Sequence, residues 1–139
     1  MPYSLDTIHP LLVHFPIALF STGLFFDILY RIFNKEELDH AGFWTMLMAL
    51  ISAPFTIMSG LIAFMGQADS IRDLSEFTHA ILMCTSILIF MVLFWIRIKY
   101  QLDLRYSETK RNIYSLLHIL AVGMLFYAAH LGAKFAGRI

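Results

Sequence analysis

Four long apolar stretches, separated by short charged segments, make up most of this 139-residue chain. A helix needs about 20 residues to cross the roughly 30 Å of hydrocarbon in a bilayer, and each stretch is that long. Only 14% of the residues are charged, against about 25% in a soluble domain. The stretches are approximately Ile8–Phe33, Ala41–Met65, Phe77–Ile98 and Ile113–Ala133. We therefore predict an all-α integral membrane protein with a single domain over residues 1–139.

The connections between these stretches are short, at Asn34–His40, Gly66–Glu76 and Lys99–Arg111. Short connections place successive helices side by side and antiparallel, which predicts an up-down-up-down four-helix bundle. Seven of the ten Lys and Arg residues fall on the side of the first and third connections, and three fall on the other side. Because Lys and Arg are enriched in cytoplasmic loops, we expect both termini to lie on the outer side.

Composition and motifs argue against several classes of function. The net charge is zero, so no nucleic-acid partner is expected. Cys84 is the single cysteine, which rules out an internal disulfide, a Cys-x-x-Cys-His haem attachment and a cysteine-ligated iron–sulfur cluster. Neither a His-Glu-x-x-His motif nor a nucleophile elbow occurs, so the sequence does not indicate a protease.

Four of the six histidines fall at the predicted outer end of the bundle: His9, His14, His79 and His130. Neutral imidazole tolerates a low dielectric and is a strong metal ligand. In an up-down bundle the first and third helices are diagonal to each other, so histidines from these two helices face across the core. We therefore predict His14 and His79 as the axial ligands of a haem b. His9 or His130 would bond a propionate or support a ligand.

Two further polar patterns have simpler interpretations. Asp27 lies well inside the first apolar stretch, and Arg31 follows four residues later. We interpret them as an ion pair on one helix face, with both side chains reaching toward the cytoplasmic interface. His40 is expected in the first connection, where it starts the second helix, and His118 lies about 18 Å from His130 toward the cytoplasmic side.

A stripe of small residues follows the second apolar stretch at helical spacing. Small side chains let neighbouring helices approach closely in lipid, which is the packing interpretation. A smooth wall for a cofactor or a quinone is the alternative. The stripe consists of Ala49, Ser52, Thr56, Ser59, Ala63 and Gly66.

The segment from His9 to Leu19, which reads His-Pro-Leu-Leu-Val-His-Phe-Pro-Ile-Ala-Leu, resembles the opening signature of a bacterial membrane family, the domain of unknown function 2231. The resemblance extends along the chain through Asp27, Pro54, the Ser59-Gly60 pair and His79. Family members usually carry a Gly-Gly segment followed by a Tyr and a His-Gly, where this chain has Ala129 to Gly137. The resemblance implies a multi-pass protein of the bacterial inner membrane. Some family members resemble fusions to Rieske-type iron–sulfur domains, and others lie beside cytochrome c. The resemblance therefore implies membrane electron transfer.

Together these features predict an electron-transfer protein that binds one haem b near the outer membrane face. It would exchange electrons with a quinol or a cytochrome c, as a subunit of a larger membrane complex rather than as a stand-alone enzyme. Two alternatives remain open. One is a cofactor-free scaffold or assembly subunit. The other is a copper-binding membrane protein, in which thioethers such as that of Met83, one turn from His79, join the imidazoles.

Overall fold

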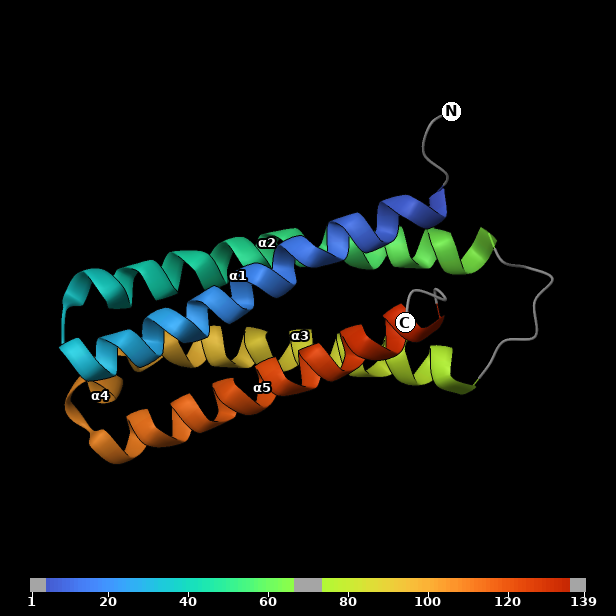
Figure 1. Ribbon diagram of the computed structural model, residues 1–139. Coiled ribbons are helices and arrows are strands. Elements are labelled where there is room, and N and C mark those ends of the chain that lie inside the picture. The colour runs from blue at the N-terminus through green and yellow to red at the C-terminus, as the bar shows by residue number, and fades with distance from the viewer. Residues whose placement is uncertain (1–4, 67–73, 136–139) are drawn as a thin grey trace.

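The computed structural model describes residues 5–66 and 74–135. Four of its helices are long and apolar enough to cross a membrane, which confirms the predicted helical membrane bundle. The long helices alternate in direction, and the described ends of the first and last helix lie at the same end of the bundle (Figure 1). The helices are α1 (Leu5–Phe33), α2 (Glu36–Gly66), α3 (Leu74–Lys99), α4 (Gln101–Tyr106) and α5 (Glu108–Phe135).

A tight turn joins α1 to α2. Asn34 has a φ of 52°, in the left-handed region that commonly ends a helix and that Asn tolerates better than most residues. Its backbone N–H donates to the Tyr30 carbonyl at 2.8 Å. The next helix begins two residues later at Glu36, and three acidic residues in its first turn complement the helix dipole. His40 therefore lies within α2 and is exposed, so the second helix begins before His40, its expected start.

The helices pair into two hairpins. α1 packs mainly on α2, and α3 packs mainly on α5, while the contacts of α1 with α5 and of α2 with α3 are lighter. Within the described residues no close backbone contact joins α1 to α3. The two helices are therefore diagonal, as the short connections predict, and Figure 1 shows the hairpins lying against each other.

The short helix α4 was not predicted. It occupies the connection between α3 and α5, and Ser107 alone separates it from α5. The Ser107 N–H donates to the Asp103 carbonyl at 2.8 Å, and the Arg111 N–H donates to the Ser107 carbonyl at 3.1 Å. The turn is thus hydrogen-bonded on both sides, and it holds α4 at the same end of the bundle as the turn between α1 and α2 (Figure 1).

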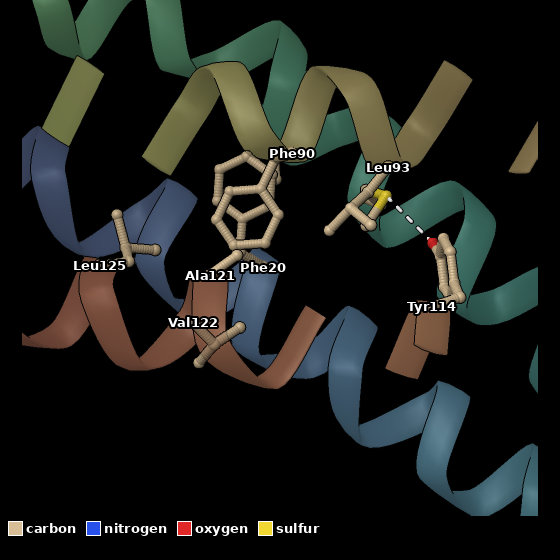
Figure 2. Packing of buried hydrophobic residues seen from close by; sticks show 9 residues of the cluster. Phe20, Phe90, Leu93, Tyr114, Ala121, Val122 and Leu125 are labelled. Carbon is tan, nitrogen blue, oxygen red and sulfur yellow. Dashed lines mark hydrogen bonds between the residues drawn. The ribbon is translucent and has the colours of Figure 1, made fainter. Parts of the chain in front are cut away.

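The core lies along the bundle axis, and side chains bridge both diagonals. Phe20 of α1 stacks on Phe90 of α3, with ring centroids 3.8 Å apart and planes 10° from parallel. The Tyr114 hydroxyl of α5 lies 4.0 Å from the Met46 sulfur of α2. Figure 2 shows the stacked rings and the Tyr114 contact. Ala49 is fully buried, which agrees with the packing interpretation of the small-residue stripe.

Buried positions on each long helix recur at alternating spacings of three and four residues, the pattern of helices that pack lengthwise. We call these rows, together with the positions that continue the same spacing at each end, the inner seams. The buried members are Val13, Pro16, Phe20, Gly23, Asp27 and Tyr30 on α1; Gly42, Met46, Ala49, Ala53 and Thr56 on α2; Ser86, Phe90, Leu93 and Arg97 on α3; and Tyr114, His118, Ala121, Leu125 and Ala128 on α5.

Candidate functional site

Ionisable side chains meet at the end of the bundle that holds α4. Each of the five helices contributes one of them, in chain order Asp27, Asp39, Arg97, Arg105 and His118. We call this set the charge network. Ionisable groups inside a membrane span are costly unless they are paired, so such a set is a candidate functional site by default.

Arg97 is the centre of the charge network. Its Nη1 donates to Asp27 Oδ1 at 2.7 Å, and its Nη2 donates to Asp39 Oδ1 at 2.6 Å. The same Nη2 also donates to the backbone carbonyl of Asp39 at 2.8 Å. Arg97 and Asp27 are only 6% and 7% exposed. Two carboxylates thus pair with one buried guanidinium, which offsets part of the large cost of removing these charges from water.

A tight backbone approach makes room for this ion pair. A Cβ at Gly42 of α2 would lie 2.6 Å from Asp27 Oδ1 and 3.2 Å from Arg97 Nη2. Both are closer than an ordinary contact with a methyl group. Glycine at this position therefore lets the pair lie directly against the α2 backbone.

His118 is completely buried, and its Nδ1 lies 3.0 Å from Asp27 Oδ2. Because an ionised carboxylate only accepts hydrogen bonds, the Nδ1–H donates, and the neutral ring then carries its lone pair on Nε2. That Nε2 has no hydrogen-bond partner among the described residues. The rings of Phe90 and Tyr114 pack edgewise against the imidazole.

The charge network continues to the surface through α4. Arg105 Nη1 donates to Glu36 Oε1 at 3.0 Å, and its Nη2 lies 3.6 Å from Asp39 Oδ2. The negative charge of Glu36 raises the pKa of the Arg105 guanidinium above its usual range. These contacts tie α4 to the first turn of α2.

The predicted ion pair between Asp27 and Arg31 is wrong. Arg31 is exposed, and its Nη2 donates to Asn112 Oδ1 of α5 at 2.5 Å. Asp27 lies on an inner seam, where partners from α3 and α5 reach it directly. Spacing along one helix identifies neighbours on that helix, and it cannot identify partners on other helices.

At the opposite end of the bundle, His9 of α1 is half-buried on an inner seam. Its Nδ1 lies 2.9 Å from the Ser59 hydroxyl, which itself donates to the Thr56 carbonyl at 2.8 Å. The hydroxyl has used its proton, so it accepts the His9 Nδ1–H. The ring packs against Gly60, where a Cβ would lie 2.9 Å from His9 Cε1.

His79 of α3 repeats this arrangement in the second hairpin. Its Nδ1 donates to the Ala128 carbonyl of α5 at 2.7 Å. The ring packs against Gly132, where a Cβ would lie 2.7 Å from His79 Cε1. In each hairpin, therefore, an imidazole from one helix packs at this end against a glycine of the other helix.

His14 and His130 lie elsewhere. Both are exposed and off the inner seams, and His14 Nδ1 donates to the Pro10 carbonyl of its own helix. The structure thus brings His9 and His79 to the inner seams and leaves His14 and His130 outside them. The axial role of His14 stays a prediction. A sequence signal for His9 exists, because the alternating spacing runs back from Asp27 through Phe20 and Val13 to His9 and passes beside His14.

The copper alternative requires a different kind of site. Among the described residues, no three His, Cys, Asp or Glu side chains come together as a set that would hold a metal ion. Cys84 is exposed on α3. A haem needs only one or two axial ligands from the protein, and a copper site that uses methionine thioethers draws on ligands outside this set.

Comparison with known proteins agrees with the membrane architecture. The model of a family described as predicted membrane protein, DUF2231, matches residues 5–139. No curated protein and no solved structure shows a significant match to the chain.

Proposed function

Because this chain belongs to the DUF2231 family of membrane proteins, and because two anchored imidazoles lie on its inner seams, we propose that it is a membrane electron-transfer protein that binds one haem b. His9 and His79 are the proposed axial ligands. The position of these two histidines in the bundle supports the proposal. Of the four histidines at this end, these two lie on the inner seams of the diagonally opposed helices α1 and α3.

The hydrogen bonds of the two rings support this choice. Each Nδ1–H donates a hydrogen bond, one to the Ser59 hydroxyl and one to the Ala128 carbonyl. In a neutral imidazole this fixes the tautomer with its lone pair on Nε2. Histidines that bind metals are commonly held in this way, by a carbonyl or other acceptor on the second nitrogen, which fixes ring orientation and raises ligand basicity. Ser59 and Ala128 are therefore positioning groups in this proposal.

A haem held by His9 and His79 would supply one-electron transfer. The proposed haem lies at the end of the bundle opposite the arginine-rich end. If the distribution of Lys and Arg sets the orientation, the haem end is at the outer membrane face. A quinol or a periplasmic cytochrome c at that face is the proposed redox partner. The protein would act in the bacterial inner membrane as a subunit of a larger respiratory complex.

Absorption spectroscopy tests the proposal. Protein expressed with ample haem and purified in detergent should show a Soret band and the low-spin spectrum of six-coordinate iron. His9→Ala and His79→Ala should each remove the low-spin spectrum. His118→Ala should keep it, since His118 lies at the other end of the bundle and bonds Asp27.

His14→Ala and His130→Ala distinguish among the possible ligand pairs. If His14→Ala removes the low-spin spectrum and His9→Ala does not, the pair is His14 and His79. Loss in His130→Ala alone would make His130 a ligand. Absence of any Soret band would refute haem binding, and metal found by elemental analysis in that haem-free protein would favour the copper alternative.

One observation favours the cofactor-free scaffold as a second candidate. α2 and α3 contact each other only lightly, and an apolar groove of about 580 Å³ lies between them. Pro54, Met58, Met91 and Trp95 are among its lining residues. A helix of another membrane subunit would fit such a groove. Photocrosslinking from position 58 in native membranes should then trap one discrete partner, whereas labelling of lipid alone would count against this role.

A further inference from the structure

A small, partly enclosed cavity lies at the α4 end of the bundle, away from the outer histidines. Its volume is about 40 Å³. Residues from all five helices line it, and four of these residues are arginines: Arg31, Arg97, Arg105 and Arg111. The acidic residues on its wall are Asp27 and Asp39. A cavity with four guanidinium groups and two carboxylates carries an excess of positive charge.

The two carboxylates are already used within the charge network. Asp27 Oδ1 pairs with Arg97 at 2.7 Å, while Asp39 pairs with Arg97 at 2.6 Å and with Arg105 at 3.6 Å. The positive charges of Arg97 and Arg105 are therefore compensated by these carboxylates. The excess of positive charge at the cavity must come from the other two arginines.

Arg31 and Arg111 have no acidic partner. Among the described residues, no carboxylate lies within 4.0 Å of either guanidinium. Arg31 donates to the neutral amide oxygen of Asn112. Arg111 Nε is buried and has no hydrogen-bond partner among the described residues. A buried donor without a partner is costly, and the cost rises for a charged group. Two uncompensated guanidiniums beside one cavity indicate that an anion completes the site.

We propose that this cavity binds a phosphate group, carried either by an anionic lipid headgroup or by free phosphate. The planar guanidinium fork matches phosphate oxygens with paired, charge-assisted hydrogen bonds. A water needs about 10–15 Å³ of such space, so the cavity holds about three waters or one phosphate group. A nucleotide or sugar phosphate is too large to be enclosed.

The location connects the site to the bilayer. The cavity lies where the spans of α1 and α3 end and the span of α5 begins. Basic pockets between membrane helices on the cytoplasmic side are suited to anionic headgroups. The neutral donors Gln101 and Ser115 also line the cavity, and they supply further hydrogen bonds to phosphate oxygens.

Native mass spectrometry of the purified full-length chain provides the lipid arm of the test, with phosphatidylglycerol and phosphatidylcholine as probes. Calorimetric titration with inorganic phosphate provides the second arm. We expect phosphatidylglycerol to bind about tenfold more tightly than phosphatidylcholine, because its net negative charge interacts favourably with the two unpaired arginines. Arg111→Gln should weaken binding of the anionic probe about tenfold, the loss expected for one charge-assisted hydrogen bond.

Lys35→Gln is the matched control, because Lys35 is exposed at the same end and does not line the cavity. It should change affinity less than about twofold, in keeping with a surface charge in high dielectric. Arg31→Gln is the second variant, should Arg111→Gln fail to fold. Removing the Arg31 guanidinium breaks no ion pair, and Arg31→Gln should also weaken binding of the anionic probe.

The outcomes separate the two sources of phosphate. Selective loss of phosphatidylglycerol binding in the arginine variants, with no binding of inorganic phosphate, identifies a lipid headgroup. Saturable binding of inorganic phosphate that these variants weaken identifies a soluble anion. Equal effects of Lys35→Gln and the arginine variants would overturn the proposal in favour of diffuse surface charge, and so would the absence of binding in both arms.

Discussion

Replacement of Arg97 by Met removes the central cation of the charge network while keeping a long side chain that fits an apolar site. Asp27, 7% exposed, would then keep His118 as its remaining partner. Asp39 would keep Arg105, at the longer distance of 3.6 Å. Removing one member of a buried ion pair costs about 3–5 kcal/mol, because the other charge stays buried without balance. We expect Arg97→Met to destabilise the folded state by that amount.

The chain offers a matched control for burial. Lys110 Nζ lies 2.7 Å from Asp103 Oδ2, the same distance as that between Arg97 and Asp27, but the two side chains are 58% and 48% exposed. An exposed pair of this kind contributes about 0–1 kcal/mol, so Lys110→Met should have little effect. Asp27→Asn should fall between the two, at about 1.5–3 kcal/mol, because Arg97 keeps Asp39 at 2.6 Å.

Reversible SDS denaturation in mixed micelles, followed by circular dichroism, gives the free energies of unfolding. The expected order of destabilisation is Arg97→Met, then Asp27→Asn, then Lys110→Met. Equal losses for Arg97→Met and Lys110→Met would refute the argument that burial determines the cost. An Arg97→Met protein more stable than the wild type would show instead that desolvation of the guanidinium outweighs its pairing.

Three further predictions use the same preparations. Gly42→Ala should destabilise the folded state by about 1–3 kcal/mol through overpacking, since the added Cβ would lie 2.6 Å from Asp27 Oδ1. The control is Gly123→Ala, whose Cβ would have nothing within 4 Å and which should be neutral or about 1 kcal/mol stabilising. Similar losses of stability for both variants would contradict the role of Gly42. Asp27→Asn should keep the haem content per protein, because Asp27 lies about 27 Å along α1 from His9; loss of the Soret band at unchanged expression would count against the proposed site. Reporter fusions after Arg105 and at the C-terminal end should report the cytoplasm and the outer side, and the reverse result would move the histidines to the cytoplasmic face.

The architecture was predictable from the sequence because its causes are local. A membrane span must satisfy its own backbone hydrogen bonds, so a sufficiently long apolar stretch becomes a helix whatever its neighbours are. Short connections then set the antiparallel order. Helix α4 escaped prediction because six residues do not hold a helix by propensity alone. Its contacts lie outside its own segment, with Arg105 reaching Glu36 at 3.0 Å.

The candidate site was only partly predictable. The four histidines at one end of the bundle were identified by depth, and depth along a helix follows from sequence position at about 1.5 Å per residue. Which histidine points inward depends on how the helix is rotated about its axis. His14 and His9 both lie near the predicted outer end, yet the structure places His9 on the inner seam and leaves His14 exposed.

The sequence alone therefore determined the number of spans, their order and the end at which imidazoles collect. Tertiary structure decided the pairing. Asp27 reaches Arg97 across 70 residues of chain and His118 across 91, and Gly42, Gly60 and Gly132 admit polar side chains that come from other helices. A helix fixes its own backbone hydrogen bonds locally, but the partner of a buried polar side chain is set by the rotation and approach of whole helices, which arises only when all of them pack together.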